Sequence, residues 1–168
     1  MDNVSDADHH RMLACEGWLE LGLPRECLGE LRGLSAGARA MPLVLNLEWR
    51  AHADLKDWPA SLDVGLRMVR EHPAEVAGWI QRSFALHELG RTPEAMQALA
   101  VAADNFPEHP VVRYNMACYA CRLGDKDAAR QWLREVVRLK GTAYVKDLAA
   151  DDDDLASLRD EILSWASD

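Results

Sequence analysis

The chain has 168 residues, which is long enough to bury a core without disulfides or metal ions, and its four cysteines are too few for a small secreted disulfide framework. The formal net charge of −9 argues against non-specific binding to nucleic acid, and no apolar run approaches the roughly 20 residues that a membrane span requires. We therefore expect a cytoplasmic protein with reduced thiols and with neither a nucleic-acid nor a membrane partner.

The N-terminal residues 1–7 are mostly polar, and we expect them to form a flexible segment. The wider opening stretch, MDNVSDADHHRML, lacks the basic stretch and following apolar run that mark a signal or transit peptide. His9 and His10 are adjacent, so they would point in different directions on a helix and make a poor pair of metal ligands.

A leucine recurs every 34 residues through most of the chain, at Leu21, Leu55, Leu89 and Leu123. A glycine follows three of these leucines, and Lys56 takes its place after Leu55. Six residues beyond each leucine lies a small side chain, at Cys27, Ser61, Ala95 and Ala129. A spacing that holds in several columns indicates an internal repeat, and repeats of this length are typical of stacked helical units.

Each period reads as a helix, a tight turn and a second helix. Apolar residues recur at intervals of three and four, as one helix face requires, at Ala129, Trp132, Leu133, Val136 and Val137. Thr92 before Pro93 favours a helix start, and Gly124 favours a helix end with a left-handed cap. One such hairpin cannot bury its own apolar face, so the units must stack on one another.

The period stops after residue 143, and the last part of the chain is acidic. Eight acids and one base lie between Asp147 and Asp168, so this stretch holds −7 of the net charge of −9. We expect a short helix, an acidic break and a final helix near residues 154–166, where apolar residues keep helical spacing. The run from Asp151 to Asp154 lacks the pattern of a calcium loop, and we interpret it as a helix cap.

These columns resemble the tetratricopeptide repeat family. The third unit carries the resemblance through Trp79, Leu86, Ala95, Leu99 and Pro107. The fourth carries it through Met116, Ala117, Gly124, Asp125, Ala129 and Leu133. The resemblance implies an all-α fold, a right-handed superhelix (α-solenoid) of four units at residues 8–41, 42–75, 76–109 and 110–143, with a capping helix in residues 144–168. The first two units depart from the pattern, because Trp49 stands in an otherwise small column and Arg39 replaces the proline.

In this family the first helix of each unit lines a concave groove that holds an extended peptide or a partner helix. The matching columns supply the residues expected to bind a peptide here: Asn46, Arg50, Ile80, Gln81, Phe84, His87, Tyr114, Asn115, Cys118 and Arg122. Amide side chains both donate and accept hydrogen bonds, so they could pair with a ligand backbone, and arginines could grip carboxylates. The lysines with which some family members clamp a terminal carboxylate are missing, and a short amphipathic segment suits this groove better.

The resulting hypothesis is a non-enzymatic interaction scaffold or adaptor, without a cofactor, that binds a peptide or amphipathic helix of a partner protein. A small acidic chaperone of the secretion type, with an apolar client, is an alternative suggested by the acidic tail. Self-association is a further hypothesis, because stacked arrays expose ends that can pair. The sequence contains no nucleophile–base arrangement, glycine-rich phosphate loop or HExxH motif.

The cysteines offer an alternative of another class, a metal or redox protein that uses Cys118, Cys121 and His87. Residues three apart on a helix point the same way, so two thiolates could share a metal ion. A structural zinc site needs four ligands and redox pairs usually sit at a helix N-terminus, so we interpret this mid-helix pair as packing or groove lining. In the resembled family, Cys15 and Cys27 occupy facing small columns, and we expect a reduced packed pair there, with a disulfide as the alternative.

Overall fold

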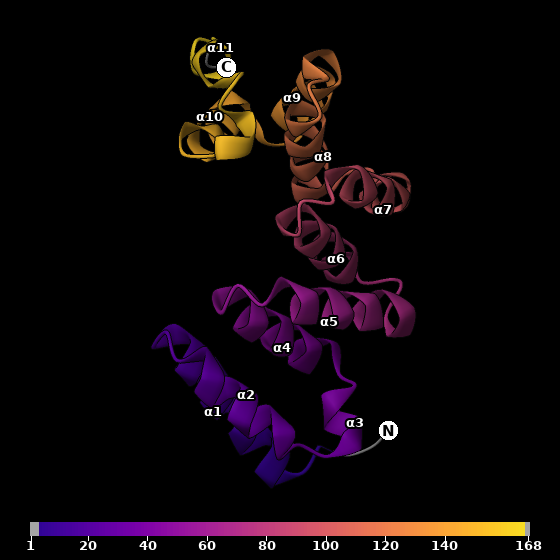
Figure 1. The fold of residues 1–168 in the computed structure, drawn as a ribbon, viewed down its shortest axis with the longest axis vertical. Helices are drawn as coiled ribbons and strands as arrows, with labels where there is room; N and C mark the ends of the chain where they lie inside the picture. Colours follow the sequence, from indigo (N-terminus) through magenta and orange to yellow (C-terminus); the bar gives the residue numbers. More distant parts are fainter. Residues whose placement is uncertain (1–3, 167–168) are drawn as a thin grey trace. The chain divides into compact units, whose positions relative to one another are not determined.

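The computed structural model describes residues 4–166, and every regular element in this range is a helix, without a β-strand (Figure 1). The chain divides into two compact units, one ending at Ala85 and the other starting at Leu86. The first unit contains α1 (Asp6–Glu20), α2 (Pro24–Arg32), α3 (Ala36–Arg39), α4 (Pro42–Asp54), α5 (Trp58–Glu71) and most of α6 (Val76–Glu88). The second contains α7 (Thr92–Asn105), α8 (Pro110–Arg122), α9 (Lys126–Lys140), α10 (Thr142–Ala150), the 3-10 helix η1 (Asp153–Leu155) and α11 (Arg159–Leu163). No helix within residues 4–166 is long and apolar enough to cross a membrane.

The 34-residue period reappears in the backbone as four left-handed turns between consecutive helices. The turn residue has φ of 70°, 54°, 75° and 86° at Gly22, Lys56, Gly90 and Gly124, respectively. Backbone N–H groups in and just after each turn donate back to carbonyl groups of the preceding helix; Asp125, for example, donates to Ala120 at 3.0 Å. Glycine enters this conformation without steric penalty, so the turn explains why glycine recurs in this column.

The helices fall into the predicted intervals in order. Residues 42–75 contain α4 and α5, residues 76–109 contain α6 and α7, and residues 110–143 contain α8 and α9. Residues 8–41 contain most of α1, all of α2 and an additional short helix, α3. The unit boundaries themselves stay a prediction.

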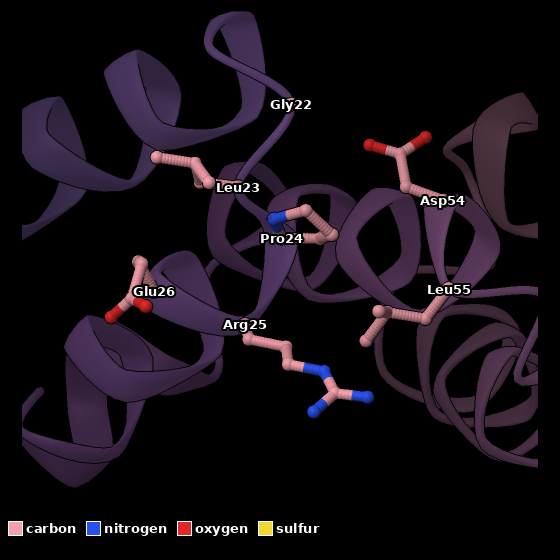
Figure 2. Close-up of a pocket in the computed structure, with 7 residues that line it drawn as sticks. All are labelled: Gly22, Leu23, Pro24, Arg25, Glu26, Asp54 and Leu55. Carbon is pink, nitrogen blue, oxygen red and sulfur yellow. The ribbon is translucent and has the colours of Figure 1, made fainter.

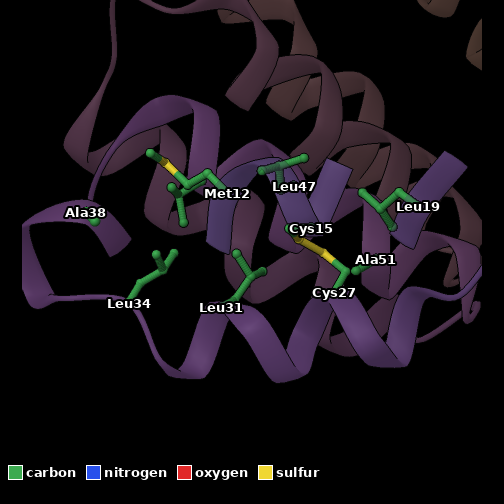
Figure 3. Close-up of a cluster of buried hydrophobic side chains, with 10 residues drawn as sticks. Met12, Cys15, Leu19, Cys27, Leu31, Leu34, Ala38, Leu47 and Ala51 are labelled. Atoms are coloured by element: carbon green, nitrogen blue, oxygen red, sulfur yellow. A yellow bond between two sulfur atoms is a disulfide. The ribbon is translucent and has the colours of Figure 1, made fainter. Parts of the chain in front are cut away.

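The core of the first unit includes side chains from α1, α2 and α4 (Figure 3). Its buried members are Met12, Cys15, Leu19, Cys27, Leu31, Leu34, Ala38, Val44, Leu47 and Ala51. Cys15 and Cys27 are fully buried in this cluster and form a disulfide, so the expectation of a reduced pair is wrong. The reason is geometric: α1 packs against α2, and the two small columns bring the two sulfur atoms together.

The start of α1 is tied to α3 through Asp8, which is buried. The Asp8 carboxylate accepts hydrogen bonds from the Ser5 hydroxyl at 2.9 Å and from the backbone N–H and hydroxyl of Ser35, both at 2.9 Å. Ser5 in turn caps α1 by accepting from the Asp8 backbone N–H at 3.0 Å. Of the N-terminal segment predicted to be flexible, residues 1–3 lie outside the described range, whereas Asp6 and Ala7 already belong to α1.

Two glycines let α5 and α6 approach each other closely within the first unit. A Cβ atom at Gly65 would lie 2.8 Å from the Cα atom of Arg82, and one at Gly78 would lie 2.8 Å from the Cβ atom of Met68. Contacts this short do not occur between real side chains and backbone, so both positions require glycine for the observed packing. The two helices that follow one another in sequence are thereby held in direct backbone contact.

The second unit is built around α8, which is buried on most of its faces. The fully buried large side chains of the second unit are Leu99, Val112, Tyr119, Leu133, Val136, Val145, Leu155 and Ile162. The prediction of one final helix near residues 154–166 is wrong, because this stretch forms η1, an irregular turn and the short α11. The apolar spacing that suggested one helix is also satisfied by successive tight turns, and Leu158 is buried as well.

Candidate functional site

The predicted binding residues fall on both units and are described separately. The first face consists of Asn46, Arg50, Ile80, Gln81 and Phe84, on α4 and the middle of α6. The second face consists of His87, Tyr114, Asn115, Cys118 and Arg122, on the end of α6 and on α8.

On the first face, two amides are joined across helices. Gln81 Nε2 donates to Asn46 Oδ1 at 2.6 Å, and Gln81 Oε1 is buried without a hydrogen-bond partner within the described range. Arg50 is exposed and forms no ion pair with any residue that the structure describes. A free guanidinium close to an oriented amide pair is suited to a ligand that offers a carboxylate and a peptide backbone.

Phe84 is engaged within the first unit more than the sequence predicted. Its ring contacts Trp49 edge-on at 6.1 Å between centroids, and Trp58 in the same manner at 5.8 Å. Such T-shaped pairs are favourable beyond the area that they bury. Phe84 and Ile80 are both half-buried, so part of their apolar surface stabilises the unit and the rest faces outward.

The second face is covered by a segment of the same chain, Asp152–Leu155, which we call the acidic segment. Tyr114 donates its hydroxyl to Asp152 Oδ2 at 2.8 Å, and Cys118 donates its thiol to the same oxygen at 3.5 Å. Two basic side chains face the other acid: His87 Nε2 lies 3.0 Å from Asp154 Oδ2, and Arg122 Nε lies 3.5 Å from Asp154 Oδ1. Four of the five predicted residues therefore contact one short stretch of chain.

Asn115 is the exception on the second face. It is half-buried, and its side chain makes no hydrogen bond within residues 4–166. The structure therefore does not bring Asn115 together with the other four residues through the acidic segment.

Burial keeps the two donors to Asp152 protonated. Burial raises the pKa of the Tyr114 hydroxyl far above its usual value, and Cys118 and Asp152 raise it further. Burial likewise raises the pKa of the Cys118 thiol, and the carboxylates of Asp152 and Asp154 add to the effect. Both groups are neutral at physiological pH, so each can donate its proton to the Asp152 carboxylate.

The sequence-based metal or redox set does not converge. Cys121 Sγ lies 3.3 Å from Ser157 Oγ, and His87 pairs with Asp154 and with the Thr92 hydroxyl, the latter at 2.9 Å from Nδ1. Within residues 4–166, the potential metal ligands that lie together are Cys118, Asp152 and Asp154. Tyr114, His87 and Arg122 already accompany both of those carboxylates, so interactions within the protein account for the cluster.

Sequence reasoning missed the acidic segment as a part of this site. A signal was present: Asp152 lies 34 residues after Cys118, so the repeat period places both residues in one column. The pocket of about 610 Å³ beside this contact is also lined by His87, Arg122, Asp153 and Asp154, together with the Gly90 turn.

A second pocket, of about 670 Å³, lies in the first unit (Figure 2). It is lined by the turn between α1 and α2 and by the end of α4, at Gly22, Leu23, Pro24, Arg25, Glu26, Asp54 and Leu55. None of the predicted binding residues lines it. Its walls are turn residues whose conformation the repeat itself dictates, and Leu23 at its rim is 44% exposed.

Helix hairpins joined by left-handed turns at a constant interval define the chain as an α-solenoid of helix-turn-helix repeats. Residues 86–151 match the tetratricopeptide repeat family. This match and the solved structures that share the fold both support the resemblance to tetratricopeptide repeat proteins. The fold supports a general role as a protein–protein interaction scaffold.

The similar solved structures are distant in sequence. The thermophilic TPR protein TTC0263 of Thermus thermophilus is 20% identical, with a TM-score of 0.73 over 94% of this chain and 87% of that one. MamA RS-1 ArsTM double mutant is 15% identical, with a TM-score of 0.73 over 96% and 94%, respectively. MamA MSR-1 C2 is 16% identical, with a TM-score of 0.65 over 82% and 76%. No curated protein sequence matches the chain.

Proposed function

We propose that the chain is a non-enzymatic adaptor that binds a peptide or amphipathic helix of a partner protein through its inner helix faces. The observation that supports this most is the convergence of four predicted residues of the second face on one short segment. A face that orders Asp152 and Asp154 through side-chain contacts has the donors and cations needed to hold a peptide.

The first face offers a complementary attachment point. Arg50 is exposed, and the Asn46 side-chain oxygen accepts from Gln81 while its N–H groups donate to no residue that the structure describes. An arginine beside an amide donor suits a partner segment with acidic side chains and an accessible backbone carbonyl. The first face thus offers polar recognition next to the half-buried side chains of Ile80 and Phe84.

The test is the capture of partner proteins by full-length protein and by charge-reversed variants. Arg50→Glu together with Arg122→Glu should abolish the capture of the partner, because both substitutions replace a free or weakly paired cation by a carboxylate. Arg134→Glu is the matched control, since Arg134 is an exposed arginine of α9 outside both faces. Circular dichroism checks that helical content is unchanged. Equal capture by the double variant and by the control would place the interface elsewhere.

The proposal also locates the chain in the cytoplasm, and the disulfide bears directly on this point. Cytosolic thiols are normally kept reduced, whereas Cys15 and Cys27 are bonded in the structure. Free thiols are alkylated during cell lysis, and the peptides that contain these two cysteines are then analysed by mass spectrometry. The result distinguishes the cytoplasm from an oxidising compartment. Alkylated Cys15 and Cys27 agree with the cytoplasm, and an intact bond argues for an oxidising compartment.

A further inference from the structure

The acidic segment contacts the second face in a definite register. Asp152 and Asp154 both point to the face, whereas Asp153 between them is exposed over 97% of its side chain and pairs only with Arg159 of the same C-terminal element. Leu155 follows and is fully buried, and η1 packs against α8. The segment therefore presents two acids separated by one free position and followed by a leucine.

Each of the two acids is matched by a different kind of group on the face. The first acid is held by two neutral donors, the Tyr114 hydroxyl and the Cys118 thiol. The second acid faces the side chains of His87 and Arg122. The two neutral donors recognise the position of one carboxylate, and the Arg122 guanidinium recognises the charge of the other. The face therefore discriminates a two-acid sequence from a single acid.

We propose that Asp152–Leu155 is an internal ligand of the second face and that this face recognises the same acid–x–acid–Leu sequence in a partner protein. This inference rests on the proposed function and specifies its ligand. The partner segment has to displace the internal copy. Acidic peptides that bind the face weakly therefore do not bind the chain, and only tighter-binding peptides do.

The internal copy is a strong competitor because it is attached to the face that it covers. The segment is tethered to α8 through α9 and α10, so it competes within the same molecule and lowers the apparent affinity of any external peptide. Additional contacts hold the C-terminal element in place beyond the acidic segment: Arg130 binds both carboxylate oxygens of Glu161 at 2.8 Å, and Lys126 donates to the Ser157 carbonyl group at 3.1 Å. A partner that contacts Arg130 or Lys126 as well would open the face more readily.

The experiment uses a fluorescently labelled synthetic peptide with the sequence AADDDDLASL, which corresponds to residues 149–158. Its binding to full-length protein is followed by fluorescence anisotropy. The variant Asp152→Asn with Asp154→Asn weakens the internal copy and changes no residue of the face. We expect it to bind the peptide at least ~10-fold more tightly than the wild type does, because the competitor is weakened.

The matched control is Asp151→Asn with Asp153→Asn. It removes the same two negative charges from the same run, but both side chains are exposed and neither contacts the face. We expect this control to bind the peptide as the wild type does. A peptide that carries asparagine in place of Asp152 and Asp154 should lose binding to the opened variant, and one that carries asparagine in place of Asp151 and Asp153 should keep it.

A second measurement needs no variant. Excess labelled peptide added to the wild type should accelerate backbone amide exchange in residues 152–155, because the internal copy is released. The proposal is overturned if the opened variant binds no more tightly than the control, or if light scattering shows that its segment pairs with a second copy of the chain. Loss of partner capture by the Arg50→Glu, Arg122→Glu variant together with no peptide binding would refute this inference alone and leave the adaptor function standing.

Discussion

Lys56 has a left-handed backbone conformation that is unfavourable for a non-glycine residue, and replacing it with glycine should stabilise the protein. It is the non-glycine residue with positive φ within the described chain, at 54°, in the turn column that is otherwise glycine. A left-handed conformation costs an L-residue about 1–2 kcal/mol, and glycine gives back about 0.5–1 kcal/mol through its larger unfolded-state entropy. Lys56→Gly should therefore raise the free energy of unfolding by about 0.5–1 kcal/mol, or Tm by about 1–4 °C.

The reverse substitution tests the same reasoning from the other side. At Gly124, with φ of 86°, an added Cβ atom would meet no atom within 4 Å, so Gly124→Ala introduces backbone strain without a steric clash. We expect a loss of about 1 kcal/mol. Urea denaturation followed by circular dichroism, with the slope of the transition unchanged, measures both variants.

A third variant distinguishes the effect of the backbone conformation on stability from the effect of the lysine side chain. Lys56→Ala keeps the strained φ but removes the ammonium group and its long side chain. We expect its stability to equal that of the wild type. If Lys56→Ala stabilises the protein as much as Lys56→Gly does, the cause lies in the lysine side chain and the explanation from φ is refuted.

Three further outcomes follow from particular groups. Cys15→Ser should lower the stability of the first unit by about 3 kcal/mol, because the bond to Cys27 closes a loop at a sequence separation of 12; denaturation with and without reductant measures this. The Cys118 thiol should react slowly with iodoacetamide near neutral pH, because burial raises its pKa, and unfolding should abolish this protection. Hydrogen bonds from Ser35, above all from its backbone N–H, lower the pKa of Asp8 below 3.8, so its stabilising contribution is present above that pH and is lost as the pH falls through the folded-state pKa; Asp8→Asn should flatten the acid limb of the stability profile.

The architecture was predictable because the same residue pattern occurs in several units of the chain. Leucine and glycine columns 34 residues apart indicated the helix hairpins, and the φ of Gly22, Gly90 and Gly124 gives the physical cause of the glycine column. The disulfide was mispredicted although its geometry was foreseen. The facing columns predict that Cys15 and Cys27 lie close together, but the sequence does not fix the redox state of the two thiols.

The binding residues were easier to predict than their surroundings, since a helical column fixes which side a residue faces but says nothing about what covers it. The run from Asp151 to Asp154 was interpreted as a helix cap, and Asp152 Oδ1 does accept the Asp154 backbone N–H at 2.9 Å. Its other carboxylate oxygen binds Tyr114, 38 residues earlier, which no local rule about helix starts addresses. The net charge of the tail does not show this either, because alternate acids of the run differ in exposure: Asp151 and Asp153 are exposed, and Asp152 and Asp154 are half-buried. For a repeat protein, the sequence that ends the array therefore has to be tested as a ligand of the array before the groove is treated as empty.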